Sequence, residues 1–213
     1  MCTGRVDLSF VLRAFQKGAD GVIIGGCWPG ECHYVTEGNY DALGNKHLSQ
    51  KLLAHIGVRP ERLRLEWIAA SEGTRFAEIM TDFTRQVKQL GRLGEGEGLD
   101  ERGLGRKLEA ASQLVPYLKL VEREKLRVRT KSERAYEELW ASDDVSKLFG
   151  ELIADKLVLG EIMLLLGEGP LSTGKISDRL GLTSSAVAKH MKTSSSRGLV
   201  CFDQDHGRYA LAR

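Results

Sequence analysis

Residues 21–33 (GVIIGGCWPGECH) constrain the fold of this chain more than any other stretch. A short apolar run, residues 22–24, ends in a glycine pair, and Cys27 and Cys32 follow within a turn. Apolar runs of this length bounded by glycine are typical of buried strands in a parallel sheet. Because open α/β sheets bind ligands just beyond the carboxyl ends of such strands, both thiols are expected where the fold places its chemistry. The C-x4-C spacing recurs in iron–sulfur proteins.

The flanking sequence predicts an α/β domain over residues 1–90. Residues 7–17, 40–56 and 71–90 have apolar side chains at helical spacing, and residues 63–69 predict a second strand. This alternation predicts a parallel sheet with helices on its faces, flavodoxin-like but incomplete, because two strands are few for a stable sheet. Residues 91–150 then predict a glycine-rich, flexible linker followed by a connector of charged helices, interrupted near Pro116.

Composition limits the classes of partner and compartment. The formal net charge of +2 gives no support for a nucleic acid or a membrane surface as partner. The most apolar run, residues 157–166, is too short to cross a bilayer, and no signal peptide is recognised, so we expect a cytoplasmic protein without a membrane segment. In that compartment, clustered cysteines indicate metal or redox chemistry more often than disulfides.

Residues 151–213 predict a winged helix-turn-helix domain. Three helices are followed by two short strands around a turn at residues 205–207, an order typical of that class. Cys201, in the first of these strands, is expected to pack rather than to bind a metal. The third helix, residues 183–197, contains no acidic residue, and its candidate contacts to nucleic acid are Ser184, Lys189, His190 and Lys192.

This third helix resembles the DNA-reading helix of repressors of the arsenic-regulator and multiple-antibiotic-resistance type. Ser194 falls where those helices usually bury a leucine. The sequence therefore predicts that this helix packs less tightly against the domain core. Residues 151–213 also contain eight Lys or Arg against seven Asp or Glu, a balance that gives weak DNA affinity. We therefore favour protein docking over DNA binding for this domain, and DNA stays an alternative partner.

The first ninety residues resemble one family at three separated stretches. These are residues 1–7 (MCTGRVD), residues 19–22 with 26–34 (ADGV and GCWPGECHY), and residues 61–73 (ERLRLEWIAASEG). In this order they resemble the delta, iron–sulfur subunit of methyl-viologen-reducing hydrogenase, the partner of heterodisulfide reductase. The resemblance implies a [2Fe-2S] cluster that relays electrons from a nickel–iron hydrogenase or a formate dehydrogenase to the flavin-bearing reductase subunit.

The cysteines of that family carry over at Cys2, Cys27 and Cys32. The family has a further strand and a C-x-x-C pair before the first shared cysteine, and a cluster needs four protein ligands. We therefore expect either that the true start lies upstream or that this copy binds its cluster poorly or not at all. Recruitment of His33 as the fourth ligand stays open, as does a zinc site made from the same three thiols and His33.

The leading hypothesis is an electron-transfer subunit of an oxidoreductase complex, with no autonomous active site and no catalytic residue. One alternative is a redox- or metal-responsive transcription regulator that acts through the winged helix. The other is a paralogue without a cluster that serves as a docking adaptor.

Overall fold

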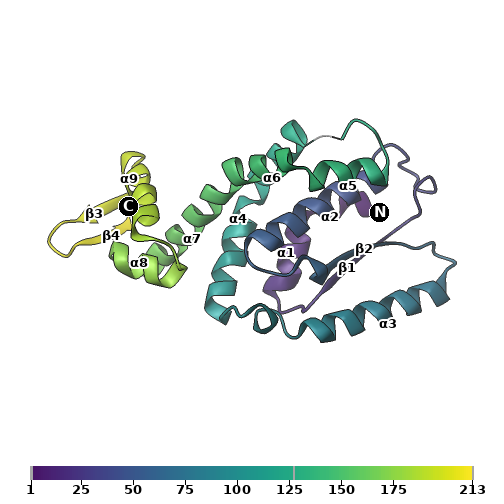
Figure 1. Cartoon of the computed structure of the whole chain (residues 1–213), viewed down its shortest axis with the longest axis horizontal. Helices are drawn as coiled ribbons and strands as arrows, with labels where there is room; N and C mark the ends of the chain where they lie inside the picture. The colour runs from purple at the N-terminus through teal and green to yellow at the C-terminus, as the bar shows by residue number, and fades with distance from the viewer. Residues whose placement is uncertain (1, 127, 213) are drawn as a thin grey trace. The chain divides into compact units, whose positions relative to one another are not determined.

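The computed structural model describes residues 2–126 and 128–212, and it divides into two compact units (Figure 1). Unit 1 ends at Ala154 and unit 2 begins at Asp155. Each unit has its own core, so each is described by itself. The elements of unit 1 are η1 (Thr3–Arg5), α1 (Leu8–Gln16), β1 (Val22–Gly26), α2 (Gly38–His55), η2 (Pro60–Arg62), β2 (Leu63–Trp67), α3 (Gly73–Leu90), η3 (Glu95–Glu97), α4 (Glu101–Lys125), α5 (Glu133–Ala141), α6 (Asp143–Phe149) and η4 (Gly150–Ala154).

Strands β1 and β2 form the sheet of unit 1. They pair in parallel, with Val22 opposite Leu63 and Gly26 opposite Trp67. Helix α2 connects them, as a parallel pair requires a crossover rather than a hairpin. Both carboxyl ends therefore lie at one edge, and the predicted parallel pairing is confirmed. Among the described residues this sheet has two strands, so the flavodoxin-like class stays a prediction.

Helices α1, α2 and α4 supply most of the buried apolar surface of unit 1. Asp7 caps α1 by accepting a hydrogen bond from the Ser9 N–H at 2.9 Å. The apolar stripe of α1 is buried as predicted, and α1 contacts both α2 and α4. Helix α3 runs along the opposite side of the strands, at the lower right of Figure 1. It buries only Ile79 and Phe83.

Helix α4 is continuous through Pro116, so the predicted interruption there is wrong. Proline removes one backbone donor and crowds the preceding turn, which normally kinks or ends a helix. Here Val115 and Leu118, on either side of the proline, are buried against the core. Packing of this apolar face outweighs the local cost.

A buried ion pair holds the glycine-rich segment, residues 91–105, against the sheet. Arg62, at the start of β2, is fully buried, and its Nε donates to Glu97 Oε1 at 2.6 Å. The other guanidinium nitrogens donate to main-chain carbonyl groups at 2.8–3.2 Å, which belong to Asp20, Leu90, Gly91 and Arg92. One guanidinium thus joins the entry to β1, the entry to β2 and the end of α3.

Unit 2 follows the predicted order of elements. It consists of α7 (Asp155–Glu168), α8 (Thr173–Leu180), α9 (Ser184–Ser196) and the antiparallel strands β3 (Val200–Asp203) and β4 (Arg208–Leu211). Gly181 makes the turn between α8 and α9 with a φ of 65°, and Thr183 caps α9. Assignment to the winged-helix class stays a prediction. Among the described residues of both units, no helix has the length and apolarity to cross a membrane.

Ser194 lies in the core of unit 2, where the sequence predicted a polar residue in an apolar position. It is 1% exposed, and its hydroxyl has no hydrogen-bond partner among the described residues. A buried hydroxyl that makes no hydrogen bond costs free energy of folding. Cys201, in contrast, is exposed on β3 and not packed as expected, because only the first residue of that strand faces the core.

Replacing Glu97 tests the buried ion pair. We expect Glu97→Gln to lower the free energy of unfolding of unit 1 by about 3 kcal/mol at neutral pH, because the Arg62 charge is left buried without a counter-charge. Urea titration followed by tryptophan fluorescence measures this, since Trp28, Trp67 and Trp140 all lie in unit 1. The exposed Glu95, in the same short helix, gives the control Glu95→Gln. Equal losses for both variants would contradict the assignment.

The same variant predicts a pH dependence. Burial acts to raise the pKa of Glu97, but hydrogen bonds from Arg62 and from backbone N–H groups outweigh it and hold that pKa below the usual value. The contribution of the pair is therefore present above the unfolded-state pKa and is lost as pH falls through the folded-state pKa. The difference in free energy of unfolding between wild type and Glu97→Gln should therefore decrease as pH falls between these two pKa values.

Replacing Ser194 tests the core of unit 2. Ser194→Ala is expected to stabilise unit 2 by about 1 kcal/mol, because it removes a buried hydroxyl without a partner. Scanning calorimetry of the full chain measures the shift in the unfolding transition. Ser195→Ala, at the next and exposed position of α9, should leave the transition within about 0.5 kcal/mol of wild type.

Candidate functional site

The three cysteines of unit 1 lie in the segments that flank β1 and α2. Cys27 directly follows β1, Cys32 lies in the loop before α2, and Cys2 directly precedes η1. The sulfur atoms of Cys2 and Cys32 are 3.5 Å apart, although the residues are separated by 30 positions in sequence. Cys32 is buried, Cys2 is half-buried and Cys27 is exposed. The structure therefore brings together two of the three predicted ligands.

Gly38 leaves the space that the two thiol groups occupy. It is the first residue of α2, and a Cβ atom there would overlap Cys32 Sγ and lie 2.7 Å from Cys2 Sγ. Any side chain at position 38 would displace both sulfur atoms. The absence of a Cβ atom thus matters here for space rather than for backbone conformation.

The backbone of Cys27 is held by a hydrogen bond, while its side chain is exposed. Its carbonyl accepts a hydrogen bond at 2.6 Å from the side-chain amide of Asn39, which is itself buried. Within residues 2–126 and 128–212, no three His, Cys, Asp or Glu side chains are grouped closely enough to hold a metal ion. His33 is exposed, with its ring against Tyr34. Neither a four-ligand cluster site nor the zinc site is assembled by these residues as they stand.

Close backbone contacts hold η1 against the end of β1. The Thr3 hydroxyl donates to the Gly25 carbonyl at 2.8 Å, and a Cβ atom on Gly26 would lie 3.1 Å from that hydroxyl oxygen. Gly26 admits this close approach, since a Cβ atom there would meet both the Thr3 hydroxyl and the Trp67 ring, and the approaching group is the segment that follows Cys2.

Glu72 joins the carboxyl ends of the two strands. Its Oε2 atom accepts from the Ala69 N–H at 2.7 Å and from the Trp28 indole N–H at 2.8 Å. These two hydrogen bonds hold the pKa of Glu72 below its usual value. The Arg75 guanidinium lies over the Trp28 ring, 4.9 Å from its centroid. No local pattern reveals this partner of Glu72, because Trp28 lies 44 positions away in sequence.

The surroundings of Cys2 disfavour negative charge on its sulfur. Burial raises the pKa of Cys2, and the neighbouring Cys32 and Asp41 raise it further against an opposing hydrogen bond from the Gly4 backbone. Burial, reinforced by Asp41, likewise raises the pKa of Glu122 to about 7. Activated cysteine nucleophiles lie in electropositive surroundings that lower their pKa. Cys2 has the opposite environment.

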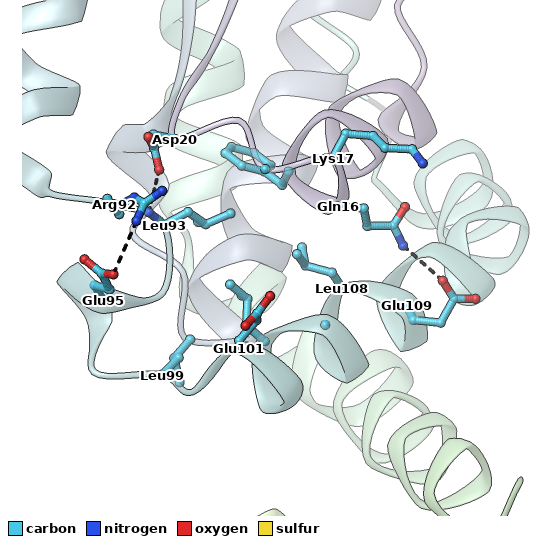
Figure 2. A pocket seen from close by; sticks show the side chains of 14 residues that line it. Gln16, Lys17, Asp20, Arg92, Leu93, Glu95, Leu99, Glu101, Leu108 and Glu109 are labelled. Carbon is cyan, nitrogen blue, oxygen red and sulfur yellow. Dashed lines mark hydrogen bonds and ion pairs between the residues drawn. The ribbon is translucent and has the colours of Figure 1, made fainter. Parts of the chain in front are cut away.

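A cavity of about 760 Å³ lies elsewhere in unit 1, between the end of α1, the glycine-rich segment and α4 (Figure 2). Leu93, Leu99 and Leu108 contribute apolar lining. Across the rim, the Asp20 carboxylate accepts from the Leu93 N–H at 2.7 Å, and Gln16 donates to Glu109. No thiol is among its described lining residues, so it is separate from the cysteine site.

The candidate nucleic-acid residues of unit 2 lie on α9. Ser184, Lys189 and Lys192 are exposed, and His190 is half-buried. Lys189 Nζ and His190 Nε2 each lie 3.9 Å from a carboxylate oxygen of Asp155. This carboxylate, at the start of α7, reduces the positive potential of the predicted contact face.

The fold and the site define a thiol-bearing α/β domain that carries a separate helical unit. Residues 1–91 match the family described as "Methyl-viologen-reducing hydrogenase, delta subunit". A relative in Methanopyrus kandleri, named as the vhu iron–sulfur subunit of F420-non-reducing hydrogenase, is 34% identical over 92 residues, which are 43% of this chain and 69% of that protein. The chain belongs to the methyl-viologen-reducing hydrogenase delta subunit family.

Two further relatives contain the same domain. An iron–sulfur subunit of F420-non-reducing hydrogenase from Archaeoglobus profundus is 54% identical over 90 residues, 42% of this chain and 65% of that protein. A subunit of ferredoxin:CoB-CoM heterodisulfide reductase from Methanosarcina mazei is 42% identical over 94 residues, 44% of this chain and 12% of that protein. This chain therefore spans less than two thirds of the length of either.

Replacing Glu72 tests its role in holding the Cys27–Cys32 loop. Glu72→Ala is expected to raise amide hydrogen exchange in that loop and at Ala69 roughly tenfold, since the variant loses both hydrogen bonds that join the two strand ends. Mass-spectrometric exchange of the full chain measures it. Glu31→Ala, an exposed position in the same loop, is the control. Unchanged exchange in Glu72→Ala would show that the loop is held by other contacts.

Proposed function

We propose that this protein is an iron–sulfur electron-transfer subunit of a larger oxidoreductase assembly. The observation that carries the proposal is the contact of the Cys2 and Cys32 thiols beside Gly38. The domain that contains them is shared with proteins named as hydrogenase iron–sulfur subunits. The proposed cluster is [2Fe-2S], which supplies a one-electron couple when bound. Cys2, Cys27 and Cys32 are its proposed ligands.

The ligand set is incomplete in these residues. Two thiols are in contact, Cys27 is exposed and is not grouped with them among the described residues, and a four-ligand cluster needs one further donor. In the proposal Cys27 approaches the pair on binding, and the fourth ligand comes from outside these three cysteines.

The relatives support the proposed partners. One relative carries this domain in a separate hydrogenase subunit, and another carries it as a small part of a heterodisulfide reductase polypeptide. A domain found both separate and fused commonly works beside the polypeptide to which it is fused. We propose that the donor is a hydrogenase or a formate dehydrogenase subunit and that the acceptor is the flavin-bearing reductase subunit. Unit 2 is proposed as the docking module.

Iron content tests the proposal. After anaerobic reconstitution with iron and sulfide, the full chain is expected to bind about two iron atoms per chain, as a [2Fe-2S] cluster requires, and to give a paramagnetic signal on reduction. Cys2→Ser and Cys32→Ser should each lower bound iron at least about fivefold, because each removes a thiolate ligand. Cys201→Ser, in the exposed cysteine of unit 2, is the matched control and should retain wild-type iron.

A chain that binds no iron above the level of the Cys2→Ser variant would contradict the proposal and leave the docking adaptor as the function. The transcription-regulator alternative makes a separate prediction, namely salt-sensitive binding to the DNA upstream of the gene. Asp155, which lies beside Lys189 and His190, weighs against it.

A further inference from the structure

The contact between Cys2 and Cys32 has a second chemical use that needs no metal. Their sulfur atoms are 3.5 Å apart, and no third ligand-type side chain is grouped with them among the described residues. A disulfide needs a close approach of two sulfur atoms from suitably placed backbones. The Cys2 and Cys32 thiols, already in contact, meet the requirement of a close approach.

Cys2 and Cys32 differ in solvent exposure, and this difference indicates which of the two thiols reacts first with a reagent in solution. Cys32 is 5% exposed, whereas Cys2 is half-buried and therefore the one that a dissolved reagent reaches. Cys27 is exposed and is not grouped with this pair among the described residues, and Cys201 lies in unit 2. An oxidant that reacts at Cys2 thus places its product beside one thiol only.

We propose that the metal-free protein closes this site as a reversible Cys2–Cys32 disulfide. In the first step the Cys2 thiolate attacks a low-molecular-weight disulfide of the glutathione class and releases one small thiol. In the second step the Cys32 thiolate attacks Cys2 Sγ, forms the intramolecular bond and releases the second small thiol. Two electrons and two protons pass from the protein to the reagent, which is reduced to two thiols.

The proposed bond withdraws two of the three candidate ligands from metals. Because the thiolate and not the disulfide binds iron or zinc, the oxidised protein cannot load until it is reduced. The site is then a modification site as well as a candidate metal site. This proposal does not rest on the electron-transfer function, since the thiol contact alone carries it.

The experiment uses the full chain, freed of metal and reduced, then transferred without reductant to oxidised glutathione at about pH 9, because the raised pKa of Cys2 makes its thiolate scarce at lower pH. After denaturation, Cys2 and Cys32 are expected to have lost both thiols, with a linked peptide pair lighter by two hydrogen atoms and no glutathione on either residue, while the exposed Cys27 and Cys201 exchange with glutathione separately. Peptide mapping should place the bond between Cys2 and Cys32. A stable glutathione adduct at Cys2, or a bond to Cys27, would overturn the proposal.

Variants distinguish formation of the Cys2–Cys32 disulfide from general reactivity of the thiols with glutathione. Cys27→Ser should still close the bond, whereas Cys32→Ser should retain glutathione on Cys2. Gly38→Ala is expected to slow closure at least about tenfold, because its Cβ displaces both sulfur atoms. Gly105→Ala, in α4 with open space around the added atom, is the matched glycine control and should close at the wild-type rate. Equal rates for the two glycine variants would count against the proposed geometry.

Iron loading keeps this proposal distinct from the proposed function. A protein that forms the disulfide but takes up no iron after reduction supports this inference and contradicts the cluster. A protein that takes up iron when reduced but forms no Cys2–Cys32 bond contradicts this inference alone.

Discussion

The rest of unit 1 depends on the burial of one guanidinium group. Arg62 lies at the start of β2, and its donors reach Glu97 and four main-chain carbonyl groups from segments that are far apart in sequence. A buried charge is tolerated only when hydrogen bonds and a counter-charge satisfy it. All of these segments must therefore be in place around the guanidinium at the same time. This requirement fixes the amino end of the two-stranded sheet. The opposite end, where both strands finish, is thereby held in register and carries the thiols.

At that carboxyl end, lack of side-chain volume matters more than charge. Gly38 admits two sulfur atoms where any other residue would place its Cβ atom. Thr3, Asn39 and Glu72 fix the surrounding backbone by hydrogen bonds to the segments that bear or flank the cysteines. Burial and the neighbouring Asp41 raise the pKa of Cys2 and so favour its protonated form when no metal is bound. Such a site does not lower the pKa of Cys2 as the sites of activated cysteine nucleophiles do, so Cys2 is expected to react slowly with an oxidant.

Much of the fold could be predicted because its signals are local. The apolar run before Cys27, the helical stripe of α1 and the cap at Thr183 each follow from residues within one or two turns. The prediction at Pro116 was wrong because its helix is stabilised by burial of Val115 and Leu118, which is a tertiary effect. The exposure of Cys201 was missed for a related reason, since a short strand next to apolar residues does not reveal which face is covered. Ser194 shows the converse, a core position that sequence identified correctly.

By itself the sequence determined the order of helices and strands, the parallel pairing of β1 with β2 and the family to which residues 1–91 belong. These follow from periodicity, glycine placement and motif spacing, which are properties of the chain alone. Only the tertiary structure decided which thiols meet, because the contact of Cys2 with Cys32 depends on the η1 segment and the start of α2 converging across 30 positions. It also decided that Arg62 is buried and hydrogen-bonded to several segments. No local sequence pattern distinguishes a solvated arginine from one enclosed by carbonyl groups that are distant in sequence.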